Sequence, residues 1–305
     1  GRKTVSTIKD GIDMSQGSLV NQFKTADILT KVIVINALIF IVVTIAAALL
    51  QISAGVLLQW FVLPEDVGRF IIQPWSLITY GFLHAGFFHI LFNMLWLYFF
   101  GRHVLNLFSE RRFLTLYLLG TISGGVVYMI SYNLFPAFSA VNGTLLGASA
   151  AVRAIMAFAA TYSPNAPVRI FTFNLKLWYI AVFLILWDLI QLPTLNNAGG
   201  LLAHLGGVLF GYVYARQLMQ GNDIGKWFEK LMDGFVNLFK PKKKRPFKTV
   251  HRNRTTQRPS QRSKKEDKSD HQKKIDAILD KIGKSGYESL TKEEKDFLFK
   301  AGKDH

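Results

Sequence analysis

Hydrophobic and polar positions in this chain separate into long blocks instead of alternating over short distances. Mostly apolar stretches recur between Lys31 and Gln220, and the residues after Gln220 are largely polar and basic. An apolar helix of about 20 residues can cross a bilayer, and fewer suffice where neighbouring helices bury it. The pattern predicts six membrane-spanning helices, at 31–52, 87–101, 113–132, 149–163, 177–193 and 200–219.

Lysine and arginine residues alternate with these stretches and indicate the direction of each span. The cytoplasmic loops of membrane proteins carry an excess of Lys and Arg. If the amino terminus is cytoplasmic, the outer loops hold one such residue, Arg69. The inner segments hold Lys24, Lys31, Arg102, Arg111, Arg112, Arg169, Lys176, Arg216 and the basic tail. We therefore expect an all-α membrane protein, a six-helix bundle with both termini in the cytoplasm.

The overall composition agrees with a membrane protein and narrows the available chemistry. Half of the 305 residues are hydrophobic and the mean hydropathy is above zero, which is rare in a soluble protein of this length. The chain has no Cys, which excludes disulfides, a thiol nucleophile and thiolate metal ligands. Neither a cleavable signal peptide nor an Arg- and Ser-rich presequence is evident, so we expect a bacterial plasma membrane.

The segment after the last span changes character twice. Residues 222–240 place apolar side chains on one helical face, which is typical of a helix in the membrane interface. Packing of that helix on the membrane domain is the alternative. Residues 241–265 are basic without an acidic residue, which predicts disorder. Beside a membrane, this charge favours attraction to anionic lipid, or simple marking of the cytoplasmic side, over nucleic acid as the partner.

The end of the chain predicts a small helical unit, because Ile275, Ile278 and Ile282 recur at helical spacing. Thr291 and Glu294 form a capping box before a further apolar pair. The predicted organisation comprises an N-terminal cytoplasmic segment, a membrane domain, an interfacial helix, a basic disordered linker and a helical unit, at 1–30, 31–219, 220–240, 241–268 and 269–305.

Polar side chains that are costly inside a membrane gather in the outer halves of three predicted spans. His84 precedes the second span, which carries His89 and Asn93 four residues apart on one face. Ser149 opens the fourth span, and His204 lies in the sixth. A serine needs a base within hydrogen-bond reach, and His204 is the candidate. His89, Asn93 and the backbone N–H of Ser149 could stabilise an oxyanion. We expect neither a metal ion nor a cofactor.

Small residues could bring the fourth and sixth spans together. Gly207 and Gly211 lie on the helical stripe of His204, where missing side chains permit close contact. The fourth span offers Ala150 and Ala154 at the same spacing. Two helices that approach this closely could bring the serine and the histidine within reach of each other.

Three motifs on three spans resemble the rhomboid family of intramembrane serine proteases. They are HAGFFHILFNM, Gly147-Ala148-Ser149 and AHLGGVLFG, whose order and spacing match over about residues 30–219. The resemblance implies a Ser–His dyad without an aspartate, with Ser149 as nucleophile and His204 as base. It also implies oxyanion donors from His89, Asn93 and the backbone. Substrates of that family are transmembrane helices, cut near the outer face where small residues let the chain unwind.

Three positions depart from the family pattern. Ala150 follows the nucleophile where glycine is common, and Trp75-Ser76 stands where a Trp-Arg pair is common. Arg153 replaces an aromatic residue that commonly packs on the catalytic histidine. An unpaired cation about 6 Å from His204 would cost its imidazolium form roughly 3 kcal/mol at an effective dielectric of about 20. An arginine without a counter-charge at this position should therefore slow catalysis.

Asp188 in the fifth span lies at a similar depth, and we hypothesise that it pairs with Arg153. With His84, both residues are expected to line the cavity of the site. The alternative is that Arg153 is an altered residue that disables or retunes the site.

Two rival functions remain. The first is a relative that binds membrane helices without cutting them, which Arg153 and Ala150 favour and the retained Ser149 and His204 oppose. The second is a proton or solute carrier, which requires polar groups through the inner halves of the spans, where almost none occur.

Overall fold

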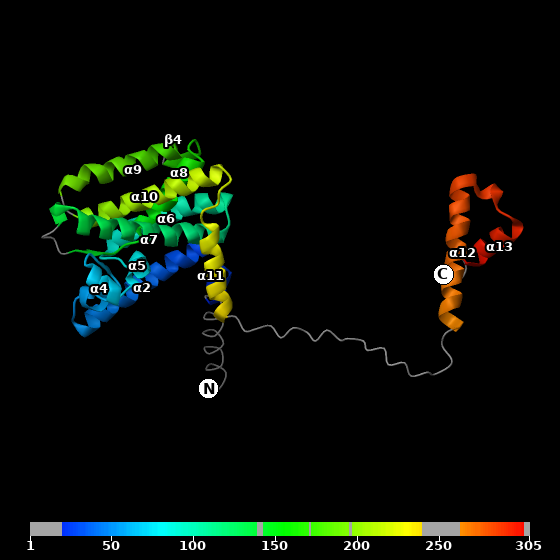
Figure 1. Cartoon of the computed structure of the whole chain (residues 1–305), viewed down its shortest axis with the longest axis horizontal. Coiled ribbons are helices and arrows are strands. Elements are labelled where there is room, and N and C mark those ends of the chain that lie inside the picture. The colour runs from blue at the N-terminus through cyan, green and yellow to red at the C-terminus, as the bar shows by residue number, and fades with distance from the viewer. Residues whose placement is uncertain (1–19, 139–142, 171, 195–196, 240–262, 302–305) are drawn as a thin grey trace, which may run out of the picture. The chain divides into compact units, whose positions relative to one another are not determined.

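The computed structural model forms two compact units, residues 1–240 and 241–305 (Figure 1). The predicted N-terminal segment is described from residue 20 onward, and the predicted linker from residue 263 onward. In full, the described residues are 20–138, 143–170, 172–194, 197–239 and 263–301.

Six long helices of the first unit coincide with the six apolar stretches of the sequence. They are α2 (Ile28–Leu50), α6 (Phe87–Leu107), α7 (Glu110–Leu134), α8 (Ser149–Tyr162), α9 (Leu177–Gln191) and α10 (Ala198–Met219). In the described part of the chain, α2, α7 and α10 are long and apolar enough to cross a membrane. Helix α6 joins them if it counts as one bent span with Ser76–Phe82, which it meets at 95°. Helices α8 and α9 are apolar but shorter, so the count of six spans stays a prediction.

Helix α8 occupies the centre of this bundle. Its residues from Ala150 to Ala160 are all buried, and it packs against α6, α7, α9 and α10. Figure 1 shows α9 and α2 on opposite sides of the bundle, with α6, α7 and α10 between them. A helix that is apolar all round is typical of a buried position. The short length of α8 is therefore compatible with a place inside the bundle, where other helices cover it.

Small residues set the distance between α8 and α10. A Cβ atom on Gly207 would collide with the carbonyl oxygen of Ala150, and one on Gly211 with that of Ala154. Because both glycines lack a side chain, the two backbones touch. The two stripes of small residues noted in the sequence thus face each other.

Short elements connect α2 to α6 and reach the segment before α8. They are α3 (Ala54–Leu58), β1 (Leu63–Pro64), α4 (Val67–Ile72), α5 (Ser76–Thr79) and the 3-10 helix η1 (Tyr80–Phe82). Strand β1 pairs antiparallel with β2 (Thr144–Leu145), with Leu63 opposite Leu145. The 3-10 helix η2 (Pro136–Phe138) precedes β2. The first connection is thereby attached to the residues that lead into α8.

A β-hairpin of β3 (Pro167–Ile170) and β4 (Phe173–Lys176) connects α8 to α9, and the 3-10 helix η3 (Leu192–Thr194) follows α9. The described residues are mostly helical, as predicted, and these two small sheets are the part that the sequence did not predict. Strands of two to four residues are too short to display an alternating pattern, which explains why the sequence did not reveal them.

Ion pairs join segments that the charge pattern assigned to the inner side. Arg102 near the end of α6 pairs with Asp27, which caps α2, at 2.7 Å. Arg112 near the start of α7 pairs with Asp223, which follows α10, at 2.7 Å. These four residues bring the corresponding helix ends together at one end of the bundle.

Helix α11 (Lys226–Phe239) carries an apolar face that the described residues leave largely uncovered. Phe228 is buried, whereas Trp227, Leu231 and Phe235 are exposed to 59%, 59% and 63%. This exposure favours the predicted place in the membrane interface over the alternative of packing on the membrane domain.

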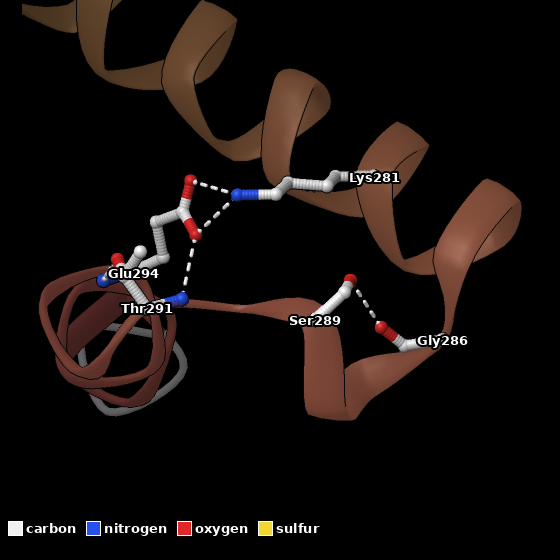
Figure 2. A network of polar contacts seen from close by, with 5 residues as sticks. All are labelled: Lys281, Gly286, Ser289, Thr291 and Glu294. Carbon is white, nitrogen blue, oxygen red and sulfur yellow. Dashed lines mark hydrogen bonds and ion pairs between the residues drawn. The ribbon is translucent and has the colours of Figure 1, made fainter.

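The second unit consists of α12 (Ser263–Ser285), the 3-10 helix η4 (Tyr287–Ser289) and α13 (Lys292–Ala301). The capping box forms as predicted: the Glu294 N–H donates to Thr291 Oγ1 at 3.3 Å, and Glu294 Oε2 accepts from the Thr291 N–H at 2.9 Å. Figure 2 shows that Lys281 of α12 also binds this carboxylate. Helix α12 begins at Ser263, within the predicted linker 241–268, most of which lies outside the described residues.

Candidate active site

A tight turn delivers Ser149 to the start of α8. Gly147 has φ +130°, a conformation that side chains disfavour. Its N–H donates to the carbonyl oxygen of Tyr80 at 3.0 Å, which anchors the turn on η1. A Cβ at this position would lie 2.8 Å from His89 Nε2 and 3.5 Å from Ser149 Oγ. Glycine is therefore required both by the backbone and by the closeness of the histidine.

His89 and Asn93 come from the first two turns of α6. The N–H of Ala85 donates to His89 Nδ1 at 3.4 Å. In a neutral imidazole the other nitrogen then carries the proton, so His89 Nε2 becomes a donor near the Gly147 turn. Asn93 Nδ2 donates to the carbonyl oxygen of His89 at 2.9 Å, which orients its amide and leaves a second N–H.

One cavity of about 410 Å³ unites side chains from α6, α8 and α10. Its polar lining comprises His89, Asn93, Ser149, Arg153 and His204, together with Asn197 at the start of α10. The remaining lining is apolar or glycine: Phe88, Phe92, Trp96, Leu146, Val152 and Gly200. The structure thus brings a hydroxyl, two imidazoles, two amides and a guanidinium to the same cavity.

Arg153 forms the hypothesised pair with Asp188. The contact is bidentate, with Nε at 2.8 Å from Oδ2 and an outer guanidinium nitrogen at 3.0 Å from Oδ1. Asp188 Oδ2 also lies 3.0 Å from His204 Nδ1. All three side chains are largely buried, with side-chain exposures of 11%, 4% and 14% for Arg153, Asp188 and His204. One carboxylate therefore connects α8, α9 and α10.

Two residues expected to line the cavity lie outside its lining. Asp188 is covered, because its carboxylate is engaged by Arg153 and His204. His84 is buried and packs edge-on against His89, with ring centroids 5.1 Å apart. His84 therefore supports the ring of His89 instead of facing the cavity.

The other two departures from the family pattern, at Ala150 and at Trp75-Ser76, are explained by contacts with neighbouring residues. Ala150 is buried, and a Cβ on Gly124 of α7 would lie 2.5 Å from its methyl group. A glycine opposite thus makes room for the alanine. Trp75 Nε1–H donates to the carbonyl oxygen of Trp60 at 2.7 Å, and Ser76 is fully buried.

Two features of the site escaped sequence reasoning. Asn197 lines the cavity from a left-handed backbone conformation, φ +59°. The Asn and Gly residues at 196–200 predict such a turn, but they do not predict which way the side chain of Asn197 points. The contact between Asp188 and His204 was also missed, because the rotation of one helix against another leaves no trace in hydropathy.

Comparison with known proteins identifies two matching regions. Residues 72–221 match the rhomboid domain, and residues 263–300 match a family of unknown function (DUF6576). The chain is 30% identical over 190 residues to the mitochondrial RHOMBOID-like protein 12 of Arabidopsis thaliana, which covers 55% of this chain and 56% of that protein.

Two further relatives have lower identity. Rhomboid protein 1, mitochondrial, of Saccharomyces cerevisiae is 25% identical over 181 residues, covering 56% of this chain and 51% of that protein. Rhomboid protease GlpG of Yersinia enterocolitica is 25% identical over 168 residues, covering 53% and 54%. The chain thus spans about half the length of these curated relatives.

The relatives also bear on the cellular membrane. The matched domain and the apolar helices identify a multi-pass integral membrane protein. Mitochondrial relatives and a chloroplastic one, Rhomboid-like protein 16 of Arabidopsis thaliana, occur beside bacterial ones. The expected location in a bacterial plasma membrane therefore gains no support from them.

Proposed function

Because this chain is a rhomboid family protein, we propose that it is an intramembrane serine endopeptidase that cleaves transmembrane helices of other proteins. The observation that carries the proposal is the shared cavity, into which three helices bring Ser149, His204, His89 and Asn93. The proposed cut lies near the outer membrane face, at the end of the bundle where α8 begins.

The proposed reaction is acyl transfer through Ser149. Its Oγ attacks the carbonyl carbon of the scissile bond while His204 Nε2 takes the hydroxyl proton. The tetrahedral oxyanion accepts hydrogen bonds from the Ser149 backbone N–H, from His89 and from Asn93. The C–N bond then breaks, His204 returns the proton to the leaving amine, and water hydrolyses the acyl-enzyme by the same steps.

The proposal includes an arrangement in the membrane. The six long helices cross the bilayer, and both chain ends lie on the side with the basic residues. The exposed apolar face of α11 supports a helix in the membrane interface, where the basic segment that follows would meet anionic lipid. Transmembrane proteins and membrane lipids are the proposed partners.

The alternative is a relative that binds membrane helices without cutting them. Arg153 favours it, because a cation beside the base opposes formation of the imidazolium. The bidentate contact with Asp188 weakens this objection, since the carboxylate compensates the guanidinium charge. We therefore keep the protease as the leading proposal.

A serine-directed fluorophosphonate tests the proposal on the purified, lipid-reconstituted full chain. We expect the wild type to be labelled covalently, and Ser149→Ala and His204→Gln to remain unlabelled. Thermal unfolding of the three proteins serves as the control for folding. A folded wild type that resists labelling would contradict the protease and favour the binding protein.

A second arm examines cleavage directly. The chain is reconstituted together with a single-span reporter whose helix carries glycines near its outer end. We expect a cut in that region with the wild type and an intact reporter with Ser149→Ala.

A further inference from the structure

Asp188 makes a contact that a dyad of serine and histidine does not contain. Its Oδ2 lies 3.0 Å from His204 Nδ1, the ring nitrogen that does not react with serine in the proposed mechanism. The residue belongs to α9, is 3% exposed and has no place in the lining of the cavity. It therefore acts on the histidine without reaching the substrate.

The contact determines which nitrogen of His204 carries the proton. A carboxylate oxygen only accepts hydrogen bonds, so Nδ1 must carry a proton for the contact to be a hydrogen bond. In the neutral ring Nε2 is then unprotonated and able to accept a proton. This is the state that a general base for Ser149 requires.

The carboxylate is held in place by Arg153. A buried charge is costly unless it is paired and hydrogen-bonded, and here two parallel N–H groups meet both oxygens of Asp188. Oδ2 accepts from both Arg153 and His204, which fixes the carboxylate between the two. Arg153 follows Ser149 by one turn on α8, so the same helix carries the nucleophile and the anchor of Asp188.

We propose that Asp188 is a positioning residue for His204, anchored by Arg153, and that the site works as a Ser149–His204–Asp188 triad. The inference rests on the proposed protease function and deepens it. During attack the proton of Ser149 Oγ moves to His204 Nε2, the Nδ1 proton stays on the ring, and Asp188 remains a carboxylate. Arg153 is then a necessary counter-charge instead of a disabling substitution.

Two double variants separate positioning from mere neutralisation of Arg153. Arg153→Met with Asp188→Leu removes both charges and the acceptor, and Arg153→Met with Asp188→Asn removes both charges but keeps an amide oxygen that can accept from His204. Replacing a buried ion pair by apolar residues of similar volume often leaves stability unchanged. Thermal unfolding verifies that both variants fold in the full chain.

The readout is the reaction with a fluorophosphonate, resolved into its maximal rate and its half-saturating concentration. We expect the Met/Leu variant to lose about 10²- to 10⁴-fold in maximal rate without a change in half-saturation. The Met/Asn variant should recover part of that loss. Equal rates in the two variants, or a wild-type rate in the Met/Leu variant, would overturn the proposal.

A spectroscopic measurement tests the contact without any activity. Nuclear magnetic resonance of isotope-labelled histidine rings reports which nitrogen is protonated, and His204→Gln assigns the signal. We expect the neutral His204 ring to carry its proton on Nδ1 in the wild type and to lose this preference in the Met/Leu variant. A proton on Nε2 in the wild type would refute the positioning role. If the proton is on Nδ1 but no fluorophosphonate reacts, the protease function alone fails.

Discussion

At the scale of single residues, the site depends on positions that leave no room for a side chain. Gly147 combines a positive φ with the closeness of His89, and Gly207 faces a backbone oxygen of α8. A Cβ atom on Gly207 would meet the backbone of Ala150, and one on Gly147 would meet the ring of His89. Neither obstacle is the flexible end of a side chain that could move aside. Such positions connect helix packing to the proposed catalysis, since they determine where Ser149 and His204 lie.

Gly207→Ala tests this connection. The added methyl group would collide with the carbonyl oxygen of Ala150 and push α10 away from α8. Overpacking typically costs about 1–3 kcal/mol, so we expect a lower melting temperature and loss of fluorophosphonate labelling. Gly234→Ala in α11 is the matched control, because a Cβ there meets nothing within 4 Å. Unchanged labelling of Gly207→Ala would show that the helices tolerate separation.

At the scale of elements, the helices are held together by different means at the two ends of the bundle. At the end with the site, close backbone contacts and the Arg153–Asp188–His204 cluster join α8, α9 and α10. At the other end, ion pairs join α2 to α6 and α7 to the segment after α10. We expect the ion pairs at this other end to respond to the pH of the solution, because their carboxylates lie outside the predicted spans.

Asp223 makes this dependence measurable. Burial alone would raise the pKa of its carboxyl group, but hydrogen bonds from Arg112 and Tyr214 outweigh burial and lower the pKa below the ordinary 3.8. A depressed folded-state pKa contributes stability above the unfolded value and loses it as pH falls through the folded value. We therefore expect the stability advantage of the wild type over Asp223→Asn to decline as pH falls below about 3.8 and to vanish only below the lower folded-state pKa.

The measurement is thermal unfolding of both proteins from neutral to acidic pH. Asp233→Asn is the matched control, because its ion pair with Arg111 is exposed and such pairs contribute little. A constant difference between wild type and Asp223→Asn across the acidic range would contradict the expected role of the pair.

At the scale of the whole molecule, the proposed function depends on how the chain crosses the membrane. All residues of the site belong to the first unit, and the second unit is a separate helical hairpin. Six crossings would put the start of α8 and the hairpin of β3 and β4 on opposite sides. The basic residues of that hairpin, Arg169 and Lys176, then share a side with α11.

Single cysteines can test this topology, because the chain has none of its own. We expect Gln59→Cys to be labelled by a membrane-impermeant thiol reagent from the outer side of sealed vesicles. Asn165→Cys and Asn222→Cys should be labelled only from the inner side. The parent protein without cysteine is the control. Labelling of Gln59→Cys and Asn165→Cys from the same side would rule out six crossings.

The sequence by itself determined where the apolar helices lie and which residues are the candidates for the proposed chemistry. Apolar stretches of spanning length anticipated all six long helices, because hydropathy follows directly from residue type. The sequence also predicted the capping box of the second unit, because this motif involves two residues only three positions apart. Ser149 and His204 stood out because polar groups are costly in lipid.

Only the tertiary structure decided how the helices are rotated and which polar groups meet. Asp188 could be placed at the depth of Arg153 from its position in the span, but its second contact with His204 depends on the mutual rotation of α8, α9 and α10. The same limit explains why His84 was expected in the cavity and instead packs behind His89. Depth along a helix follows from residue number, whereas the direction of a buried side chain follows from packing against helices distant in sequence.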